Sequence, residues 1–287
     1  MKVFVTGDIH GNKALIHRAL KVVREEHLDA LIIAGDIAAK GFYQLLKKNS
    51  GYEIRSAFSV RDRALMTGTK SNIRKYLDLA GFIEQDGTYL SLSEIQSKQE
   101  KNLREICKLL QLAGIPVFML IGNDDHIPDS DWDKTLEEFG ITNLNLKTHN
   151  LGPWKITGFQ YVPPTPWNTN NELPEEKLFK MLRPIEKRVD TNTIFVTHGP
   201  PRNVLDRLNN GLHAGSESIR ELVEKKQPAF HIFGHIHESF GQEKIRNTLC
   251  CNAACLWIKH ILRGYILDLD NTSVREIKFP LPYMGII

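Results

Sequence analysis

The side chains that could do chemistry in this sequence are carboxylates, imidazoles and one amide that follow short apolar runs. Groups of these types bind divalent metal ions, and a mixed set favours Mn, Fe, Zn, Co or Ni over the oxygen-preferring Ca and Mg. The candidate ligands are Asp8, His10, Asp36, Asn123, His198, His235 and His237. Two i, i+2 pairs occur among them, and in extended backbone each pair would lie on one face of the chain.

The number of candidate ligands predicts more than one ion. They are too many for a single zinc ion that keeps an open catalytic position, and they suit two cations bridged by one carboxylate. Two neighbouring dications can clamp a phosphate and lower the pKa of a bridging water, so that hydroxide forms near neutral pH. Because only Asp8 and Asp36 are anionic, two dications would leave the ligand shell at about +2, or about +1 with hydroxide. The sequence therefore predicts a site that attracts a phosphate oxyanion.

Buried strands are the elements that would bring these ligands together. Five apolar runs end just before the candidates, at residues 2–6, 30–34, 117–121, 193–197 and 229–233. Helical patterns alternate with the runs, which is typical of α/β architecture. In open α/β sheets ligands bind at the carboxyl ends of the strands, so we expect all the candidates at one edge. Glycines at positions 7, 35, 122 and 234 would let the backbone turn sharply or approach an ion there.

Other local patterns predict helices, hairpins and an insertion. Asn12 is expected to cap a helix, a second helix to cover about 101–112, and Ser218 with Glu221 to form a capping box. Antiparallel hairpins are expected at 264–279 and around 154–161. The stretch at about 40–96 lacks a strong buried run and is interpreted as a helical insertion over one side of the site.

The order of the motifs resembles a known family. Asp-x-His, Gly-Asp, Gly-Asn-x-Asp, His-Gly and Gly-His-x-His, between residues 8 and 237, look like the calcineurin-like metallophosphoesterase family. Residues 197–201 and 233–238 look like its phosphodiesterase branch. The resemblance implies a four-layer α/β/β/α sandwich with two mixed β-sheets, in a single domain over residues 1–287. It also implies one ion held by Asp8, His10, Asp36 and His237, and a second held by Asp36, Asn123, His198 and His235.

The sequence departs from that family where the catalytic acid is expected. Members commonly read Gly-Asn-His followed by Asp or Glu, and that histidine is taken as the general acid for the leaving alkoxide. This chain has Asp124 there, followed by Asp125, which we expect to orient ligands. Nearby cations would lower the pKa of Asp124, so it would be a poor proton donor. Either His126 or His213 donates the proton, or the leaving group needs none, in which case aryl phosphodiesters would react much faster than alkyl ones.

Three further residues are candidates for substrate contact: Asn123, Arg202 and Asn252. Arg202 follows His-Gly-Pro-Pro and could hold phosphate oxygens as a fork, or lie in a solvated loop. Asn252 follows an apolar run in a stretch where members of the family often carry asparagine. His231 lies within a strand pattern and is expected to pack rather than to react.

Composition limits the partners and the compartment. Lys+Arg is 37 and Asp+Glu is 34, a formal net charge of +3. A nucleic-acid partner, which usually needs a dense basic stripe, is therefore less favoured than a small phosphodiester or nucleotide-like substrate. No secretory leader and no membrane span are recognisable, so the expected location is cytoplasmic. Three of the cysteines lie among small apolar residues at 250, 251 and 255, which favours buried free thiols over a thiolate metal site.

The leading interpretation is a dinuclear metal-dependent phosphoesterase that acts on a phosphodiester by in-line attack of metal-bridged hydroxide. Manganese is expected to support activity in vitro. One alternative is a metal-binding scaffold with little turnover, which the missing histidine motivates. Another is a metal-dependent nuclease, which would need a basic, aromatic-lined track to the site. The sequence indicates neither the natural substrate nor an oligomeric state.

Overall fold

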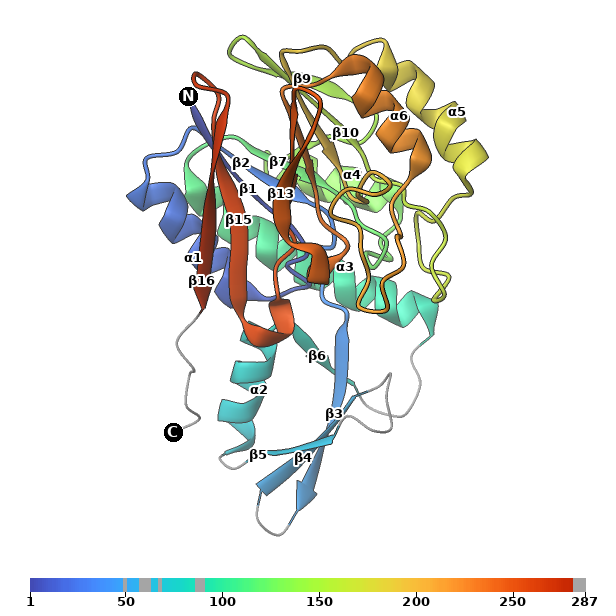
Figure 1. The fold of residues 1–287 in the computed structure, drawn as a ribbon. Coiled ribbons are helices and arrows are strands. Elements are labelled where there is room, and N and C mark those ends of the chain that lie inside the picture. Colours follow the sequence, from blue (N-terminus) through green and yellow to red (C-terminus); the bar gives the residue numbers. More distant parts are fainter. Residues whose placement is uncertain (49–50, 57–62, 67–68, 86–90, 281–287) are drawn as a thin grey trace.

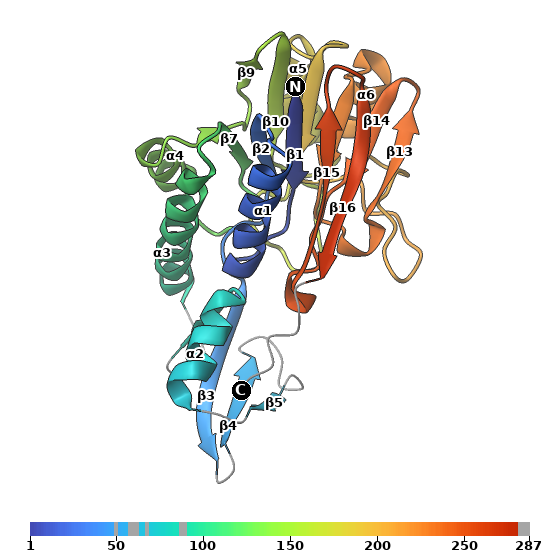
Figure 2. The same cartoon turned by 90° about the vertical axis from the view of Figure 1, so that its left-hand side faces the viewer.

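The computed structural model describes residues 1–48, 51–56, 63–66, 69–85 and 91–280. Two six-stranded β-sheets pack face to face, and helices cover both outer faces (Figures 1 and 2). This arrangement is the four-layer α/β/β/α sandwich with two mixed sheets that was predicted. Among the helices within the described ranges, none has the length and apolarity to cross a membrane.

The first sheet has the strand order β16-β15-β1-β2-β7-β8. Its parallel strands are β1 (Lys2–Thr6), β2 (Ala30–Ala34), β7 (Val117–Leu120) and β8 (Thr142–Asn143). The predicted C-terminal hairpin is present as β15 (Ile261–Asp268) and β16 (Ser273–Pro280), which extends the sheet through antiparallel pairing of β15 with β1. The outer face is covered by α1 (Lys13–Glu25), α3 (Leu92–Leu110) and α4 (Asp129–Glu138).

The second sheet has the strand order β13-β14-β12-β11-β10-β9. Its parallel strands are β10 (Trp154–Phe159), β11 (Thr193–Thr197), β12 (Phe230–Phe233) and β14 (Thr248–Asn252). The edges are the antiparallel strands β9 (Thr148–Leu151) and β13 (Gly241–Ile245). The outer helices here are α5 (Glu175–Glu186) and α6 (Glu217–Lys226), and the short 3-10 helices of the chain are η1 (Gln111–Ala113), η2 (His237–Ser239) and η3 (Trp257–Lys259).

Three hydrophobic clusters fill the three interfaces between the layers. In β1, Val3 and Val5 face the second sheet while Phe4 faces the helices, and all three are fully buried. Strands buried on both faces read as continuous apolar runs, which explains why β1 and β2 could be delimited from the sequence. These strands fix where their carboxyl ends lie.

The starts of the helices agree with the sequence in part. Asn12 caps α1 as predicted, and Ser91 forms a capping box at the start of α3, which begins earlier than expected. The predicted capping box at Ser218 is wrong, because Ser216 caps α6. The hydroxyl of Ser218 instead donates to the carboxylate of Glu175 at 2.6 Å, which ties α6 to α5.

The stretch at about 40–96, expected as a helical insertion, consists mostly of strand where the structure describes it. A third sheet of order β5-β4-β3-β6 is formed by β3 (Gly41–Lys48), β4 (Gly51–Ser56), β5 (Arg63–Met66) and β6 (Phe82–Glu84), with α2 (Lys70–Leu79) beside it. The helical expectation is wrong because these strands pair with one another, β3 with β4, β4 with β5 and β3 with the distant β6. The mixed polar and apolar pattern of the stretch does not reveal this pairing. The insertion extends from the edge where β2 ends (Figure 1).

Candidate metal centre

The seven candidate ligands lie at one edge of the sandwich, at the carboxyl ends of strands from both sheets. The first sheet supplies Asp8 and His10 after β1, Asp36 after β2, and Asn123 after β7. The second sheet supplies His198 after β11, and His235 and His237 after β12. The sequence predicted this placement because parallel strands end at a common edge.

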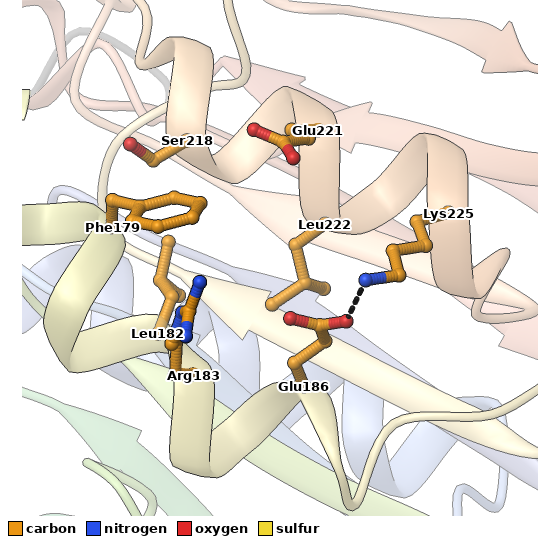
Figure 3. Close-up of a pocket in the computed structure, with 8 residues that line it drawn as sticks. All are labelled: Phe179, Leu182, Arg183, Glu186, Ser218, Glu221, Leu222 and Lys225. Atoms are coloured by element: carbon orange, nitrogen blue, oxygen red, sulfur yellow. Dashed lines mark ion pairs between the residues drawn. The ribbon is translucent and has the colours of Figure 1, made fainter.

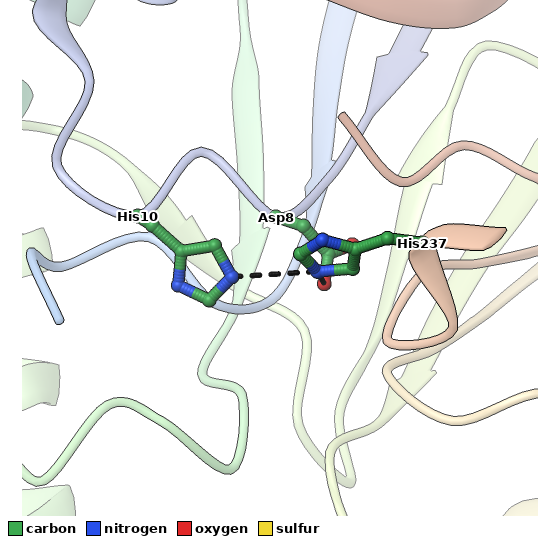
Figure 4. Close-up of side chains that lie close together, drawn as sticks. All are labelled: Asp8, His10 and His237. Atoms are coloured by element: carbon green, nitrogen blue, oxygen red, sulfur yellow. Dashed lines mark hydrogen bonds and ion pairs between the residues drawn. The ribbon is translucent and has the colours of Figure 1, made fainter. Parts of the chain in front are cut away.

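The first group of ligands is Asp8, His10 and His237, whose ligand atoms all lie within 4.8 Å of one another. The Nε2 atom of His237 lies 3.0 Å from Oδ1 of Asp8 and 3.5 Å from Nε2 of His10. Figure 4 shows the two rings and the carboxylate turned toward a common point. Two imidazoles and one carboxylate in this arrangement can hold one divalent cation.

The second group is Asp36, His198 and His235, again with ligand atoms within 4.8 Å of one another. Oδ1 of Asn123 lies 2.9 Å from Nε2 of His198, which adds an amide oxygen to the group. Oδ1 of Asp36 lies 3.4 Å from Nε2 of His198, and its Oδ2 lies 3.6 Å from Nε2 of His10 in the first group. The Asp36 carboxylate therefore presents one oxygen to each group.

The backbone of these ligands is not extended, so the extended-chain argument for the i, i+2 pairs is wrong. Asp8, His10, Asp36 and His235 have φ angles of 55°, 46°, 51° and 67°. Left-handed backbone at non-glycine residues is uncommon and clusters at functional sites, where surrounding contacts hold it. The left-handed turn at His235 helps to separate its ring from that of His237, so the pair contributes to different groups.

Two glycines make room for the carboxylates. A Cβ atom on Gly122 would lie 2.1 Å from Oδ1 of Asp36, and one on Gly234 would lie 2.1 Å from Oδ2 of Asp8. A side chain at either position would displace the carboxylate, so these two strand-end glycines allow the close approach that the sequence suggested.

Comparison with known proteins decides the family. The sequence profile of the calcineurin-like phosphoesterases matches residues 1–239. The chain belongs to this family. An uncharacterized protein of Methanocaldococcus jannaschii is 31% identical over 160 residues, which cover 53% of this chain and 70% of that protein. Metallophosphoesterase domain-containing protein 1 of Homo sapiens is 24% identical over 252 residues, 85% of this chain and 65% of the human protein.

A solved structure described as a novel archaeal phosphodiesterase has the same fold. It superimposes with a TM-score of 0.50 and 14% sequence identity, covering 97% of this chain and all of that chain. At this identity the likeness concerns the fold alone. Family membership implies bound divalent cations, and the two groups of ligands are the residues to test against that expectation.

The donor set fits divalent cations, and the hydrogen bonds of His198 show how. Its Nδ1 lies 2.9 Å from the carbonyl oxygen of Ala34, so this nitrogen carries the proton and Nε2 faces Asp36 and Asn123. Burial lowers the pKa of His198, but the Asp36 carboxylate outweighs it and raises the pKa to about 10. Burial also lowers the pKa of His235 to about 3. Without a cation, a proton on His198 balances the buried carboxylates, and an ion would take its place.

Asp125 ties together the turns after β2 and β7. Its carboxylate accepts hydrogen bonds from the backbone N–H groups of Ile37, Ala38 and Gly122, at 2.7 to 3.2 Å. Burial, with the nearby Asp36 charge, raises the pKa of Asp125 to about 7. It orients the turns that carry the ligands, as the sequence analysis expected.

Asp124, in place of the histidine common in the family, lies beside the site. Its carboxylate falls within 4.8 Å of ligand atoms of His10 and Asp36, and its Oδ2 accepts a hydrogen bond from Nζ of Lys40 at 2.6 Å. Burial raises the pKa of Asp124, but the Lys40 charge outweighs it and the net shift is downward. Asp124 is therefore an ionised acceptor and not a proton donor.

The side chain of His213, one of the two other candidate acids, is bonded within its own loop. Within the described ranges, neither His126 nor His213 has a ring nitrogen bonded to any of the seven ligands. His213 pairs with Asp206 through Nδ1 at 2.5 Å, and Nη1 of Arg202 donates to the carbonyl oxygen of His213 at 2.8 Å. Arg202 and His213 thus stabilise the loop after β11, while His126 remains half-buried next to the turn after β7.

Asn252, expected to contact substrate, has its side chain engaged within the protein. It is fully buried, and its amide group donates to the carbonyl oxygens of Leu205 and Ile236, at 3.2 and 2.9 Å. Its Oδ1 accepts from the backbone N–H of Ala254 at 3.1 Å. The side chain of Asn252 therefore holds backbone at Leu205, Ile236 and Ala254, and the contact with Ile236 fixes the turn between His235 and His237.

Several residues that support the site were missed by sequence reasoning. Arg263 is buried and donates to the carbonyl oxygen of His237 at 2.8 Å, from the middle of an otherwise apolar strand. Gln99 and Asn102 are buried polar residues on the core face of α3. Their i, i+3 spacing places them on the apolar face of a helix, which could have indicated buried polar residues from the sequence. No sequence pattern around Lys40 indicated that it lies beside the site.

A hollow lies between α5 and α6 in the outer helical layer (Figure 3). Its lining includes Phe179, Leu182 and Leu222, and an ion pair between Glu186 and Lys225 at 2.5 Å. None of the seven candidate ligands lines it. The candidate metal ligands therefore lie at the strand ends and not in this hollow.

Proposed function

We propose that this chain is a dinuclear metal-dependent phosphodiesterase. The observation that carries the proposal is the Asp36 carboxylate, which faces His10 with one oxygen and His198 with the other. A carboxylate placed between two groups of ligands suits a bridge between two cations. The first ion would be held by Asp8, His10, Asp36 and His237, and the second by Asp36, Asn123, His198 and His235.

The bound ions would polarise the phosphoryl oxygens and lower the pKa of the attacking water. The residues of the chain hold that arrangement in place. Asp125 fixes the turns after β2 and β7, and the Ala34 carbonyl oxygen fixes the tautomer of His198. Asn252 and Arg263 hold the backbone around His237. Preorganised ligands of this kind lower the cost of stabilising charge in the transition state.

A diester is favoured over a monoester by the charge of the site. Asp124 and Lys40 form an ion pair, so they cancel and the two dications with Asp8 and Asp36 leave about +2. Ionisation of the attacking water would reduce this charge to about +1, which a diester monoanion balances. The archaeal phosphodiesterase of the same fold is consistent with this preference. We expect Mn, Fe, Zn, Co or Ni to bind, and Mn to support activity in vitro.

We also propose that the protein acts in the cytoplasm on a small phosphodiester or nucleotide-like substrate. Cys107, Cys250, Cys251 and Cys255 are all free and buried. Unpaired thiols are typical of a reducing compartment.

Elemental analysis of the purified protein, combined with hydrolysis of bis-p-nitrophenyl phosphate with and without added Mn²⁺, tests the proposal. About two metal ions per chain and metal-dependent turnover are expected. His235→Ala should lose turnover while its circular dichroism spectrum stays that of the wild type. Two bound ions without turnover on any diester would indicate a metal-binding scaffold instead, and a protein that binds no added metal would contradict the proposal.

A further inference from the structure

Lys40 and Asp124 form an ion pair that connects the two turns closest to Asp36. Lys40 follows the turn after β2, Asp124 follows Asn123 after β7, and Nζ lies 2.6 Å from Oδ2. The backbone N–H of Asp124 donates to Oδ1 of Asp36 at 2.9 Å. The ammonium group therefore contacts a carboxylate that lies within 4.8 Å of ligand atoms of His10 and Asp36.

The backbone around this pair is held from α3. The side-chain amide of Gln99 donates to the carbonyl oxygens of Ala39 and Asp124, at 3.0 and 2.9 Å. Oδ1 of Asn102 accepts from the N–H of Ala39 at 3.0 Å. Gln99 and Asn102 are both buried, so the residues that carry the ammonium and its carboxylate are fixed to one rigid helix.

The ion pair is more exposed to solvent than the ligands Asp36 and His198. The side chains of Lys40 and Asp124 are 39% and 19% exposed, whereas those of Asp36 and His198 are 2% and 0% exposed. A phosphoester that enters past this ion pair would come close to the ammonium group.

Lys40 also supplies what Asp124 cannot. An ionised carboxylate only accepts hydrogen bonds, whereas an ammonium group has three donors, and the bond to Asp124 uses one. Within the described part of the chain the other two donors have no acceptor and are available to an incoming anion. Charge-assisted hydrogen bonds to phosphate oxygens are among the stronger ones in proteins.

We propose that the Lys40 ammonium group donates a hydrogen bond to the leaving oxygen of the bound phosphodiester, and that Asp124 positions it. The inference rests on the proposed phosphodiesterase function. Lys40 thereby takes over the stabilisation of the leaving oxygen that a histidine gives in other members of the family, without itself having to give up a proton. Asp124 is a positioning residue, because it acts through Lys40.

The test compares two methyl aryl phosphodiesters with Mn²⁺-loaded protein, one releasing p-nitrophenol and the other releasing phenol, a poorer leaving group. Lys40→Met should lose about a hundredfold in kcat on the phenyl ester, in line with loss of an oxyanion donor, and much less on the p-nitrophenyl ester. Lys40→Arg should recover part of the loss. The matched control is Lys13→Met, because Lys13 is also a part-buried lysine paired with carboxylates, those of Asp78 and Glu105, but on α1. It should behave like the wild type.

Two further readouts separate this role from a structural one. Metal content of Lys40→Met should stay at the wild-type level, while its affinity for inorganic phosphate, measured by calorimetry on the Mn²⁺-loaded protein, should fall. Asp124→Asn should show a weaker form of the same leaving-group dependence. The double variant should be no slower than Lys40→Met alone, because residues that act as one unit are not additive.

Each outcome decides the inference. Equal losses of Lys40→Met on both esters, or additive effects in the double variant, would overturn it while leaving the phosphodiesterase function intact. A wild-type protein that binds two ions and hydrolyses neither ester would overturn both proposals together.

Discussion

The backbone at Gly234 packs closely against the carboxylate of Asp8. A Cβ there would approach Oδ2 of Asp8 to 2.1 Å, whereas one on Gly7, directly before Asp8, would meet its nearest atom at 3.5 Å. We therefore expect Gly234→Ala to weaken metal binding by at least about tenfold, because it displaces a ligand. Gly7→Ala is the matched control and should bind metal normally. Metal titration of both variants checks this, and equal affinities would contradict it.

His231 is a second residue with a measurable signature, although it lies outside the site. Its ring is fully buried, stacks on Phe195, and lies 3.0 Å from the hydroxyl of Thr197 through Nε2. That hydroxyl donates to the carbonyl oxygen of Gly199, so Nε2 must carry the proton in the neutral ring. Burial lowers the pKa of His231 to about 3. The sequence-based expectation that His231 packs rather than reacts agrees with this environment.

The titration of His231 predicts acid sensitivity. Its pKa is lower in the folded chain than the ordinary value of 6.5, so the unfolded chain binds a proton that the folded chain excludes. The free energy of unfolding should therefore fall as pH drops below about 6.5, by about 2 to 3 kcal/mol at pH 4.5. Urea unfolding of metal-free His231→Gln should show a smaller fall. His149→Gln, at a half-buried histidine on β9, is the control and should follow the wild type.

Among the elements, the loop between β10 and α5 contacts the turn after β7 that carries Asn123. Thr169 accepts a hydrogen bond from the side chain of Asn123 at 2.7 Å, and the N–H of Asn170 donates to the Asn123 carbonyl oxygen at 3.0 Å. Glu172 accepts from the backbone N–H of Thr169 at 2.8 Å and so braces the loop. The same loop leaves Trp167 77% exposed. An exposed indole in a loop that is bonded to a candidate ligand is suited to stack on an aromatic or nucleotide group.

We expect Trp167→Ala to raise KM for aryl and nucleotide-like diesters by about tenfold, with little change in kcat or stability. Leu112→Ala is the control, since Leu112 is also a large exposed apolar residue, 64% exposed, but lies in η1. Steady-state kinetics on bis-p-nitrophenyl phosphate checks the prediction. An unchanged KM in Trp167→Ala would show that the loop does not contact the substrate.

The elements also show how far sequence reasoning reaches. β1, β2 and β11 could be predicted to the residue, because strands buried on both faces are uninterrupted apolar runs, and the ligands follow directly from where they end. The third sheet could not be predicted, because its longest strands, β3 and β4, mix polar with apolar residues and lack the continuous apolar run of a strand buried on both faces. Likewise, the role of Lys40 follows from the pairing of two turns, and that of Asn252 from the backbone groups it meets. Such contacts exist only after the chain has folded.

For the whole molecule, the protonation of His198 in the metal-free protein should make the stability of the fold depend on pH. In the metal-free protein, the Asp36 carboxylate, working against burial, raises the pKa of His198 from 6.5 to about 10. The proton on His198 therefore stabilises the folded state below about pH 6.5, and this stabilisation is lost as pH rises toward 10. Thermal unfolding of chelator-treated protein should show a midpoint that falls between pH 6.5 and 9. The same measurement on His198→Gln should give a flatter profile, and identical profiles would contradict the assignment.

The seven ligands come from both sheets, and this has a mechanical consequence. Asp8, His10, Asp36 and Asn123 follow strands of the first sheet, the other three histidines follow strands of the second, and Asp36 lies between the two sets. Each ion would be bound by residues from both sheets, so it would link the two sheets and close long stretches of chain as a cross-link does. Such links would slow the separation of the two sheets during unfolding, so a chelator would shorten the lifetime of the folded state as well as stop turnover. The same ions would then serve both the reaction and the stability of the fold.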